Sequence, residues 1–392
     1  MTDSPAAPAR PLIYLMAGEP SGDLLGGRLM QALKEKTGGA VSFAGVGGET
    51  MTAEGLESLF PMEEISLMGL IELLPHARNL FARMRQTVAE IRRLKPDAIV
   101  TIDSPGFCLG VLNRLGDTDI PRIHYVAPSV WAWREGRLKK FVGRTDHMLC
   151  LLPFEPPWFE RAGLPATFVG HPVLERGIEK ADGAGFRSSH GIDPGDLLLG
   201  VFPGSRKGEL NHHMPIFRQT VALLSERYPG LKVVIPSVAA TAERIRSEAA
   251  DWAAPVIVVT GEQERYAAMA ACNYALAASG TVAIELAQSK VPSVVAYHTN
   301  PLTEFIARRM VKVRFANLCN ILVDEEVVPE RIQRDCRADI LAADLEKLIE
   351  DKESARAQID RVTKIMAQLM PSDGMPSETA ARVVLDQVQS SQ

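Results

Sequence analysis

The chain has 392 residues, of which 46% are hydrophobic and 23% charged, and its formal net charge is −5 at pH 7. This length exceeds a typical single core and predicts two domains, and the charge gives no electrostatic case for nucleic acid as a partner. The five cysteines form no Cys-x-x-Cys pair and are odd in number, which argues against a disulfide framework and a zinc site. No apolar run is long enough to span a bilayer and the first residues lack the apolar core of a signal peptide, so a cytosolic protein is expected.

Short apolar or β-branched segments alternate with longer helical patterns, which indicates parallel α/β architecture. We predict a flexible tail at residues 1–11 and then, in the first half, strands at residues 12–17, 98–102, 123–126 and 147–152. In the second half, the predicted strands lie at residues 197–202, 232–235, 256–259, 274–277 and 293–296. The expected fold class is α/β, with two doubly wound Rossmann-like domains that face a central crevice.

The predicted domain linker lies at residues 177–196, because this segment is rich in Gly, Asp and Ser and weak in periodicity. It separates a first domain at residues 12–176 from a second domain at residues 197–365. Residues 366–392 form a helical tail that we expect to pack back on the first domain or on a partner subunit of a homodimer. In doubly wound sheets, ligands bind beyond the carboxyl ends of the strands, so the residues after each strand are the candidates for function.

A strand end that turns into a helix near residue 280 is the strongest of these candidates. Ser279, Gly280 and Thr281 form the turn, and unpaired N–H groups at a helix start beside a glycine favour the binding of an anion. Glu285 stands one helical turn after Thr281 on the same face, where a carboxylate suits a ribose diol. The pair indicates a sugar nucleotide, although an ordinary capped helix explains the motif if it stands alone.

A Pro/Gly loop after the first strand of the second domain supplies positive charge. It contains Gly204, Ser205, Arg206 and Lys207. An arginine can bind phosphate in a bidentate manner and a lysine adds charge, so the loop is a candidate phosphate site. A solvated turn explains the loop about equally well when it is taken by itself.

Two segments that follow strands of the first half carry carboxylates. Gly18, Glu19, Ser21 and Gly22 lie in a glycine-rich turn, where the backbone can approach a ligand closely. A tight turn capped by Ser21 is the alternative, but it leaves Glu19 unexplained. Asp103 follows a later strand and is a candidate base, although a lone Asp at a strand end is more often a cap or turn residue.

Aromatic residues follow another predicted strand of the first half. Ser129, Trp131 and Trp133 lie there, and amphipathic aromatics beside a crevice suit contact with a sugar or an acyl chain, although core packing explains most tryptophans. His212 and His213 lack Cys or carboxylate neighbours at ligand spacing, so we expect exposed histidines at a helix start and no metal site.

Taken together, the motifs resemble those of one family. In chain order they are residues 17–23 (AGEPSGD), 45–48 (GVGG), 68–69 (MG), 103, 124–133 (HYVAPSVWAW), 152–155 (LPFE), 170–172 (GHP), 203–206 with 209, and 278–285. They resemble the lipid-A-disaccharide synthases, which are glycosyltransferases with the two-domain B fold. The chain departs from the family where that pattern commonly reads Asp-x-Pro-Asp-Phe-Asn, because Gly106 and Cys108 replace the second Asp and the Asn.

The resemblance implies a specific reaction. UDP-2,3-diacylglucosamine donates its sugar to the 6-hydroxyl of 2,3-diacylglucosamine 1-phosphate, with inversion and without a metal or another cofactor, and this gives the β-1,6-linked lipid A disaccharide 1-phosphate and UDP. Asp103 is then expected to be the general base, with Glu19 as the second candidate. Arg206 and Lys207 are expected to neutralise the departing diphosphate, and Asn320 matches a family asparagine near the donor.

Acylated substrates lie in a membrane, so the resemblance also implies contact with lipid. An apolar segment with Leu70, Ile71 and Leu74 leads into a basic pattern with Arg83 and Arg85, which suits an interfacial helix. A packed helix with a solvated basic face is the alternative for this segment taken alone. With lipid substrates implied, we expect a cytoplasmic enzyme that binds peripherally to the inner membrane of a Gram-negative bacterium.

Two other classes of function stay open. A sugar-nucleotide 2-epimerase, or a transferase with a soluble acceptor, would share the architecture but would not need the apolar segment at residues 67–74. A non-catalytic nucleotide-binding or membrane-scaffold protein would bind UDP without turnover.

Overall fold

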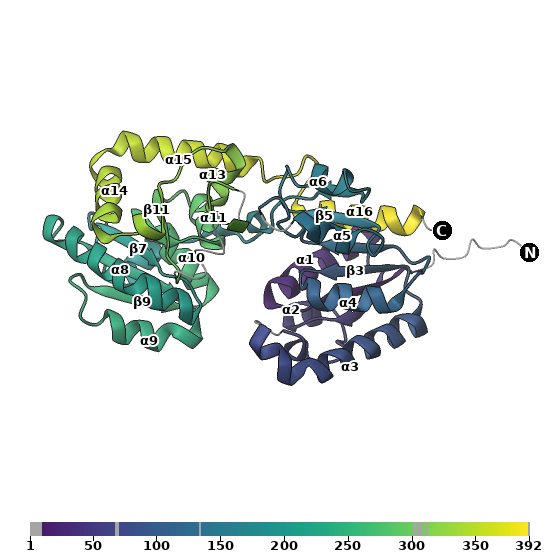
Figure 1. The fold of residues 1–392 in the computed structure, drawn as a ribbon. Helices are drawn as coiled ribbons and strands as arrows, with labels where there is room; N and C mark the ends of the chain where they lie inside the picture. Colours follow the sequence, from purple (N-terminus) through teal and green to yellow (C-terminus); the bar gives the residue numbers. More distant parts are fainter. Residues whose placement is uncertain are drawn as a thin grey trace, which may run out of the picture. The chain divides into compact units, whose positions relative to one another are not determined.

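A computed structural model describes residues 10–66, 70–132, 135–300, 304, 309–310 and 313–390, and for residues 70–77 and 135 it describes the backbone alone. The chain forms two compact units. The first comprises the chain up to Pro172 together with residues from Leu369 onward, and the second runs from Val173 to Gln368. Figure 1 shows helices around the sheet of each unit.

The first unit is built on a parallel six-stranded sheet in the order β2-β1-β3-β4-β5-β6. Its strands are β1 (Leu12–Ala17), β2 (Ser42–Val46), β3 (Ala98–Ile102), β4 (Arg122–Tyr125), β5 (His147–Cys150) and β6 (Ala166–Phe168). Its helices are α1 (Pro20–Thr37), α2 (Glu49–Ala53), η1 (Met62–Glu64), α3 (Leu70–Leu94), α4 (Pro105–Leu115), η2 (Glu135–Arg137), α5 (Leu138–Phe141), α6 (Pro156–Glu160) and α16 (Pro376–Ser390).

The second unit repeats this architecture with the strand order β12-β11-β10-β7-β8-β9. Its strands are β7 (Leu198–Phe202), β8 (Lys232–Ser237), β9 (Val256–Thr260), β10 (Tyr274–Ala278), β11 (Ser293–Tyr297) and β12 (Glu330–Ile332). Its longer helices are α7 (Gly183–Ser189), α8 (Lys207–Arg227), α9 (Ala239–Ala249), α10 (Glu262–Ala271), α11 (Thr281–Gln288), α13 (Leu318–Val323), α14 (Ala338–Glu350) and α15 (Lys352–Ala367). Short 3-10 turns are η3 (Pro172–Glu175), η4 (Ile178–Lys180) and η5 (Gln333–Asp335).

Alternating strand residues build a core on each face of the sheets. In β1, Ile13 and Leu15 join a cluster with α1 and α16, whereas Tyr14 and Met16 join a cluster with α3 and α4. Successive side chains of a strand point to opposite faces, so a strand covered by helices on both sides is apolar throughout. This double burial explains why the parallel strands are continuous apolar runs in the sequence.

The structure places the change of unit earlier than the predicted linker. The chain enters the second unit at Val173, and the segment at residues 177–196 belongs to that unit. Its α7 has a buried Phe186 that packs in one cluster with Ile192, Leu198 and Val234. The Gly-rich composition therefore marks a small helix and its turns, which Phe186 and Ile192 anchor in the core.

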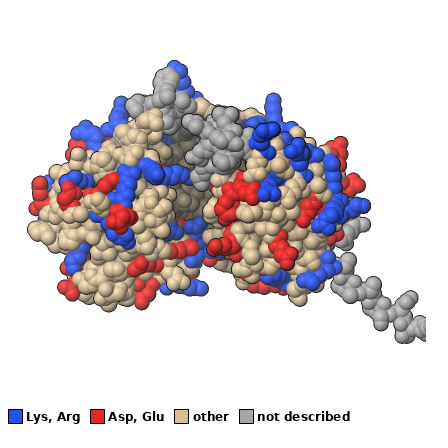
Figure 2. Space-filling model, turned by 90° about the horizontal axis from the view of Figure 1, so that it is seen from below, with Lys and Arg blue, Asp and Glu red and all other residues tan. Residues whose placement is uncertain are grey.

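The helical tail returns to the first unit. Its last helix, α16, packs against α1, and Ala380, Ala381 and Val384 are fully buried in the cluster that contains Leu29 and Leu33. The predicted strands agree with the observed ones within two residues at each end, but β2, β6 and β12 were not predicted. Figure 2 shows Lys and Arg side chains interspersed with Asp and Glu on both units.

Candidate functional site

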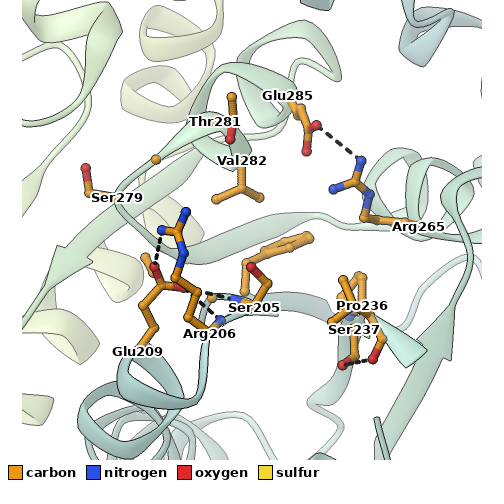
Figure 3. A pocket seen from close by; sticks show the side chains of 15 residues that line it. Ser205, Arg206, Glu209, Pro236, Ser237, Arg265, Ser279, Thr281, Val282 and Glu285 are labelled. Carbon is orange, nitrogen blue, oxygen red and sulfur yellow. Dashed lines mark hydrogen bonds and ion pairs between the residues drawn. The ribbon is translucent and has the colours of Figure 1, made fainter. Parts of the chain in front are cut away.

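A pocket in the second unit lies beyond the carboxyl ends of β7, β8 and β10 (Figure 3). It is lined by Phe202, Gly204, Ser205, Arg206, Glu209, Pro236, Ser237, Val238, Arg265, Ala278, Ser279, Gly280, Thr281, Val282 and Glu285. Two motifs that are far apart in the sequence thus meet there, because β7 and β10 are neighbours in the sheet. This is the position at which doubly wound sheets bind ligands.

Glu209 fixes the loop that carries Arg206. Its Oε2 accepts hydrogen bonds from the N–H groups of Ser205 at 3.0 Å and Arg206 at 3.2 Å. Gly204 has a φ of 103°, and a Cβ there would lie 2.4 Å from Oε2 of Glu209, so only glycine fits. Arg206 contacts Oε1 of Glu209 at 3.2 Å but keeps 71% of its side chain exposed, which leaves donors for a ligand (Figure 3). Lys207 begins α8 and does not line the pocket.

The helix α11 begins at the floor of the pocket. Gly280 is its N-cap and has a φ of 149°, and no side chain caps the helix. The first N–H groups of α11 are therefore open to an anion in the pocket. The hydroxyl of Ser279 does not cap the helix, because it donates to the carbonyl of Ala316 at 3.2 Å.

Glu285 is buried at the pocket wall between two arginines. It is 1% exposed, and its Oε1 accepts from Arg176 at 2.5 Å and from Arg265 at 3.2 Å. Burial raises the pKa of Glu285, and the two guanidinium groups act in the opposite direction. Sequence reasoning missed both arginines, which lie 109 and 20 residues away along the chain.

Asn320 does not reach the pocket. It is fully buried, its Oδ1 accepts from the N–H groups of Val327 and Val328, and its Nδ2 donates to the carbonyl of Val328. Its amide also approaches Glu330, which binds the N–H groups of residues 316 and 317. In this structure Asn320 holds a turn behind Ser279, and its contact with the donor stays a prediction.

At the first sheet, the candidate carboxylates Glu19 and Asp103 follow paired strand ends. Ala17 of β1 is in register with Ile102 of β3, so Glu19 and Asp103 come at the same edge. The loops that follow β1 and β3 lie close together, because a Cβ at Gly18 would lie 2.4 Å from Oγ of Ser104. The two candidate carboxylates, which were identified after separate strands, therefore follow neighbouring strand ends.

The backbone at this edge is strained. Asp103, Ser104 and Val126 have φ values of 50°, 42° and 81°, in a region that side chains other than glycine rarely adopt. The N–H of Asp103 donates to the carbonyl of Tyr125 at 3.0 Å, which joins the two strained segments. Burial raises the pKa of the Asp103 carboxyl, which brings it closer to the range of a general base.

The turn after β1 is organised by its aspartate. Asp23 is buried and accepts from the N–H groups of Gly48, Thr50 and Met51, so it fixes the start of α2. Ser21 is exposed inside the first turn of α1 and makes no cap, because Glu19 is the N-cap residue. The last residue of the AGEPSGD motif is therefore structural, and Gly22 is buried under the same turn.

Trp131 is held by a carboxylate that the motif analysis did not assign. Its indole N–H donates to Glu155 at 3.0 Å, and its ring meets Phe154 edge to face. Ser129 is exposed nearby in the sequence, whereas Trp133 lies outside the described residues. Glu155 belongs to the LPFE motif, so two of the diagnostic motifs meet in this contact.

The predicted exposure of His213 was wrong. His213 is fully buried, its Nδ1 lies 2.8 Å from the carbonyl of Pro203, and its Nε2 accepts from the N–H of His298 at 3.0 Å. It therefore ties the Arg206 loop to the end of β11. Among the described residues, no group of three His, Cys, Asp or Glu side chains is arranged to hold a metal ion.

The structure describes only part of the residues that were predicted to contact a membrane. The backbone of Leu70, Ile71 and Leu74 lies in α3, but their side chains are outside the described part of the chain. Arg85 is exposed, whereas Arg83 donates to both carboxylate oxygens of Glu64 and is engaged in the fold. None of the helices within the described residues is long and apolar enough to cross a membrane.

Known proteins match the chain over nearly its whole length. A family model described as lipid-A-disaccharide synthetase matches residues 13–384. The lipid-A-disaccharide synthase of Rhodospirillum centenum is 49% identical over 377 residues, which cover 96% of this chain and 94% of that protein. The lipid-A-disaccharide synthase of Gluconobacter oxydans is 43% identical over 375 residues, with coverage of 96% and 90%.

Solved structures with low sequence identity share the fold. The UDP-GlcNAc 2-epimerase from Neisseria meningitidis bound to UDP-GlcNAc aligns with a TM-score of 0.60 at 12% identity and covers 97% of this chain and 99% of that chain. MurG from Acinetobacter baumannii aligns with a TM-score of 0.58 at 13% identity and covers 96% of this chain and 99% of that chain. The fold admits several activities, and the full-length identity decides among them: this chain belongs to the lipid-A-disaccharide synthase family and is a glycosyltransferase, specifically a hexosyltransferase, of lipid A biosynthesis.

Proposed function

We propose that the enzyme transfers the sugar of UDP-2,3-diacylglucosamine to the 6-hydroxyl of 2,3-diacylglucosamine 1-phosphate, with inversion and without a metal ion. The products are the β-1,6-linked disaccharide 1-phosphate and UDP. One observation carries the donor part of this proposal, namely that Arg206, the start of α11 and Glu285 line one pocket. A nucleoside diphosphate needs a cation and N–H donors for its phosphates and an acceptor for its ribose hydroxyls.

The donor pocket supplies charge where the leaving group develops it. Arg206 offers guanidinium donors, and the open N–H groups of Gly280 and Thr281 lie at the positive end of the helix dipole. Both stabilise a departing diphosphate more than a bound neutral group. The structure of S. aureus MnaA with UDP aligns with this chain at a TM-score of 0.62, which supports the proposal of a UDP site on this architecture.

The acceptor part of the proposal rests on the edge of the first sheet. Asp103, with its pKa raised by burial, is the proposed base that removes the proton of the acceptor hydroxyl. Glu19, at the same edge, is the second candidate and would otherwise orient the acceptor. Trp131, held by Glu155, is proposed to contact the sugar or an acyl chain.

The proposed site of action is the surface of a bacterial inner membrane. Acyl chains keep both substrates in lipid, and the apolar start of α3 followed by the exposed Arg78 and Arg85 suits an interfacial segment.

Incubation of the purified protein with the two acylated substrates tests the reaction directly. We expect release of UDP in equal amount to a disaccharide 1-phosphate detected by mass spectrometry, with a β-1,6 linkage by NMR. Asp119→Asn serves as the control for Asp103→Asn, because Asp119 is exposed and precedes β4. Binding of UDP without turnover on these substrates would remove the proposal, and interconversion of the UDP-sugar alone would favour an epimerase.

A further inference from the structure

An arginine that does not line the pocket, Arg176, contacts the carboxylate of Glu285. It lies directly after η3, three residues beyond the point at which the chain enters the second unit. Its Nη1 donates to Oε1 of Glu285 at 2.5 Å, and its side chain is 18% exposed. Arg265, which does line the pocket, binds the same oxygen from α10.

The two oxygens of Glu285 are used unequally. Oε1 accepts from both arginines, whereas Oε2 is buried and accepts no hydrogen bond from any described residue. An unsatisfied buried carboxylate oxygen is costly, and such groups in native proteins are normally paired with water or with a ligand. A ribose hydroxyl that donates to Oε2 would complete the set of hydrogen bonds.

We propose that Arg176 is a positioning residue for the ribose of the donor: it holds Glu285 by one oxygen, in one orientation and as a carboxylate, so that the other oxygen accepts a hydroxyl. The inference rests on the donor site proposed above. Arg176 itself does not line the pocket, so its effect on the nucleotide passes through Glu285. Arg265 is less suited to test this role, because it can also touch the ligand.

The charged groups around Glu285 determine the expected pH dependence. Arg176 and Arg265 lower its pKa, whereas burial and Glu262, on α10, raise it. Tyr266, also on α10, accepts from Arg265 at 3.1 Å and donates to Glu262. Removal of the Arg176 charge takes away one of the groups that lower the pKa of Glu285, so this pKa should rise. The carboxyl then keeps its proton up to a higher pH. A protonated carboxyl is the weaker acceptor for a hydroxyl.

The test compares two nucleotides and three variants by calorimetry. UDP and 2′,3′-dideoxy-UDP are titrated into the wild type, Arg176→Met and Arg176→Lys, with circular dichroism as the check of folding. Arg218→Met is the control, because Arg218 forms an exposed ion pair with Asp251 away from the pocket. A hydrogen bond to a charged group corresponds to about tenfold or more in affinity.

We expect Arg176→Met to bind UDP about tenfold or more weakly and to bind 2′,3′-dideoxy-UDP like the wild type. Arg176→Lys should lose less, because it keeps the charge, and the pH midpoint of UDP binding should move upward in Arg176→Met. A merely structural role would weaken both nucleotides alike and would leave the midpoint unchanged.

The two possible failures look different. If the wild type does not distinguish UDP from its dideoxy form, the contact of Glu285 with the ribose is wrong and the role of Arg176 is wrong with it. If the wild type distinguishes them and Arg176→Met does so equally well, the donor site stands and the role of Arg176 is overturned. Should Arg176→Met not fold, the same comparison of nucleotides and pH midpoints is made in Arg176→Gln, which also removes the charge but keeps a polar side chain.

Discussion

The indole N–H of Trp131 donates a hydrogen bond of 3.0 Å to Oε1 of Glu155, and Oε2 of the same carboxylate accepts from the N–H groups of Leu151 and Leu152. A carboxylate thus joins the loop after β4 to the loop after β5. Burial raises the pKa of Glu155 to about 7. The contact therefore links two motifs that lie 24 residues apart in the sequence.

Glu155→Gln should destabilise the first unit by about 1–3 kcal/mol, because an amide has a single acceptor oxygen for three N–H donors and one donor is left unpaired. Urea unfolding followed by tryptophan fluorescence measures this change. Glu160→Gln on the exposed side of α6 is the control and should be close to neutral. Equal stability of both variants would show that the Trp131 contact adds nothing.

Asp103→Asn should lower kcat by about 100-fold or more while UDP binding is kept, because a general base acts in the transition state. The pKa of Asp103 is raised by burial, so kcat of the wild type should fall as the pH drops through a midpoint above the usual range of an aspartate. Steady-state rates over a pH series, beside calorimetry with UDP, measure both effects. Wild-type kcat in the variant would transfer the role of the base to Glu19.

Arg206→Ala should weaken both UDP binding and turnover, by about tenfold or more, because its charge faces phosphate in the ground state and in the transition state. The guanidinium of Arg206 also forms an ion pair with Glu209. Glu209 is therefore left unchanged in this variant. Calorimetry with UDP gives the affinity, and Arg218→Ala provides a control with similar exposure. Unchanged affinity would place Arg206 outside the donor site.

Acid should destabilise the first unit through His124. This residue is buried beside Thr101, at 2.6 Å from its hydroxyl, and burial lowers the pKa of His124 to about 3. The unfolded chain, with a pKa near 6.5, binds the proton first, so stability is complete above that pH and is lost as the pH falls. The loss from this residue is about 2 kcal/mol between pH 6.5 and 5.

His124→Gln should therefore flatten the dependence of the unfolding free energy on pH. Phe141→Leu is the matched control, because its ring contacts that of His124 with centroids 4.9 Å apart and does not titrate. It should lower stability at every pH without a change in slope. An unchanged slope in His124→Gln would mean that the pKa of the imidazole is not lowered in the folded protein.

The proposed membrane contact should respond differently to apolar and charged substitutions. Replacement of Leu70, Ile71 and Leu74 by Ser should reduce vesicle binding at any salt concentration. Replacement of Arg78 and Arg85 by Ser should matter mainly at low salt, since surface charges are screened over about 8 Å at physiological ionic strength. Co-sedimentation with anionic vesicles across a salt series measures both.

Arg83 is left unchanged in that experiment, because its ion pair with Glu64 and its position over the ring of Phe60 make it part of the fold. Circular dichroism checks that each variant folds. If the variant with Ser at positions 70, 71 and 74 folds and still sediments with vesicles like the wild type, the proposed membrane contact of this segment is wrong. The segment would then pack in the core or line a substrate pocket.

Most strands of the two sheets, and the loops that follow them, could be predicted from the sequence alone. A strand covered by helices on both faces must be apolar along its whole length, and a loop such as the one at Gly204 must contain glycine where φ is positive. These requirements are local, so single residues and short runs report them. Three strands, β2, β6 and β12, were not predicted. The strands β6 and β12 have three residues each, too few for a pattern, and in β2 an apolar run is interrupted by Ser42 and Gly45.

The side chains that support the site could be identified only from the three-dimensional arrangement of the chain. Arg176 and Glu285 form an ion pair although they lie 109 residues apart in the sequence. Asn320, which matched a family motif, uses its amide in hydrogen bonds to the backbone of Val327 and Val328. His213 was expected at the surface and is buried between Pro203 and His298. Such pairings depend on how β7, β10 and β11 lie side by side in the sheet. A hydrogen bond between distant segments produces no pattern in the sequence of either segment, so it could not be predicted.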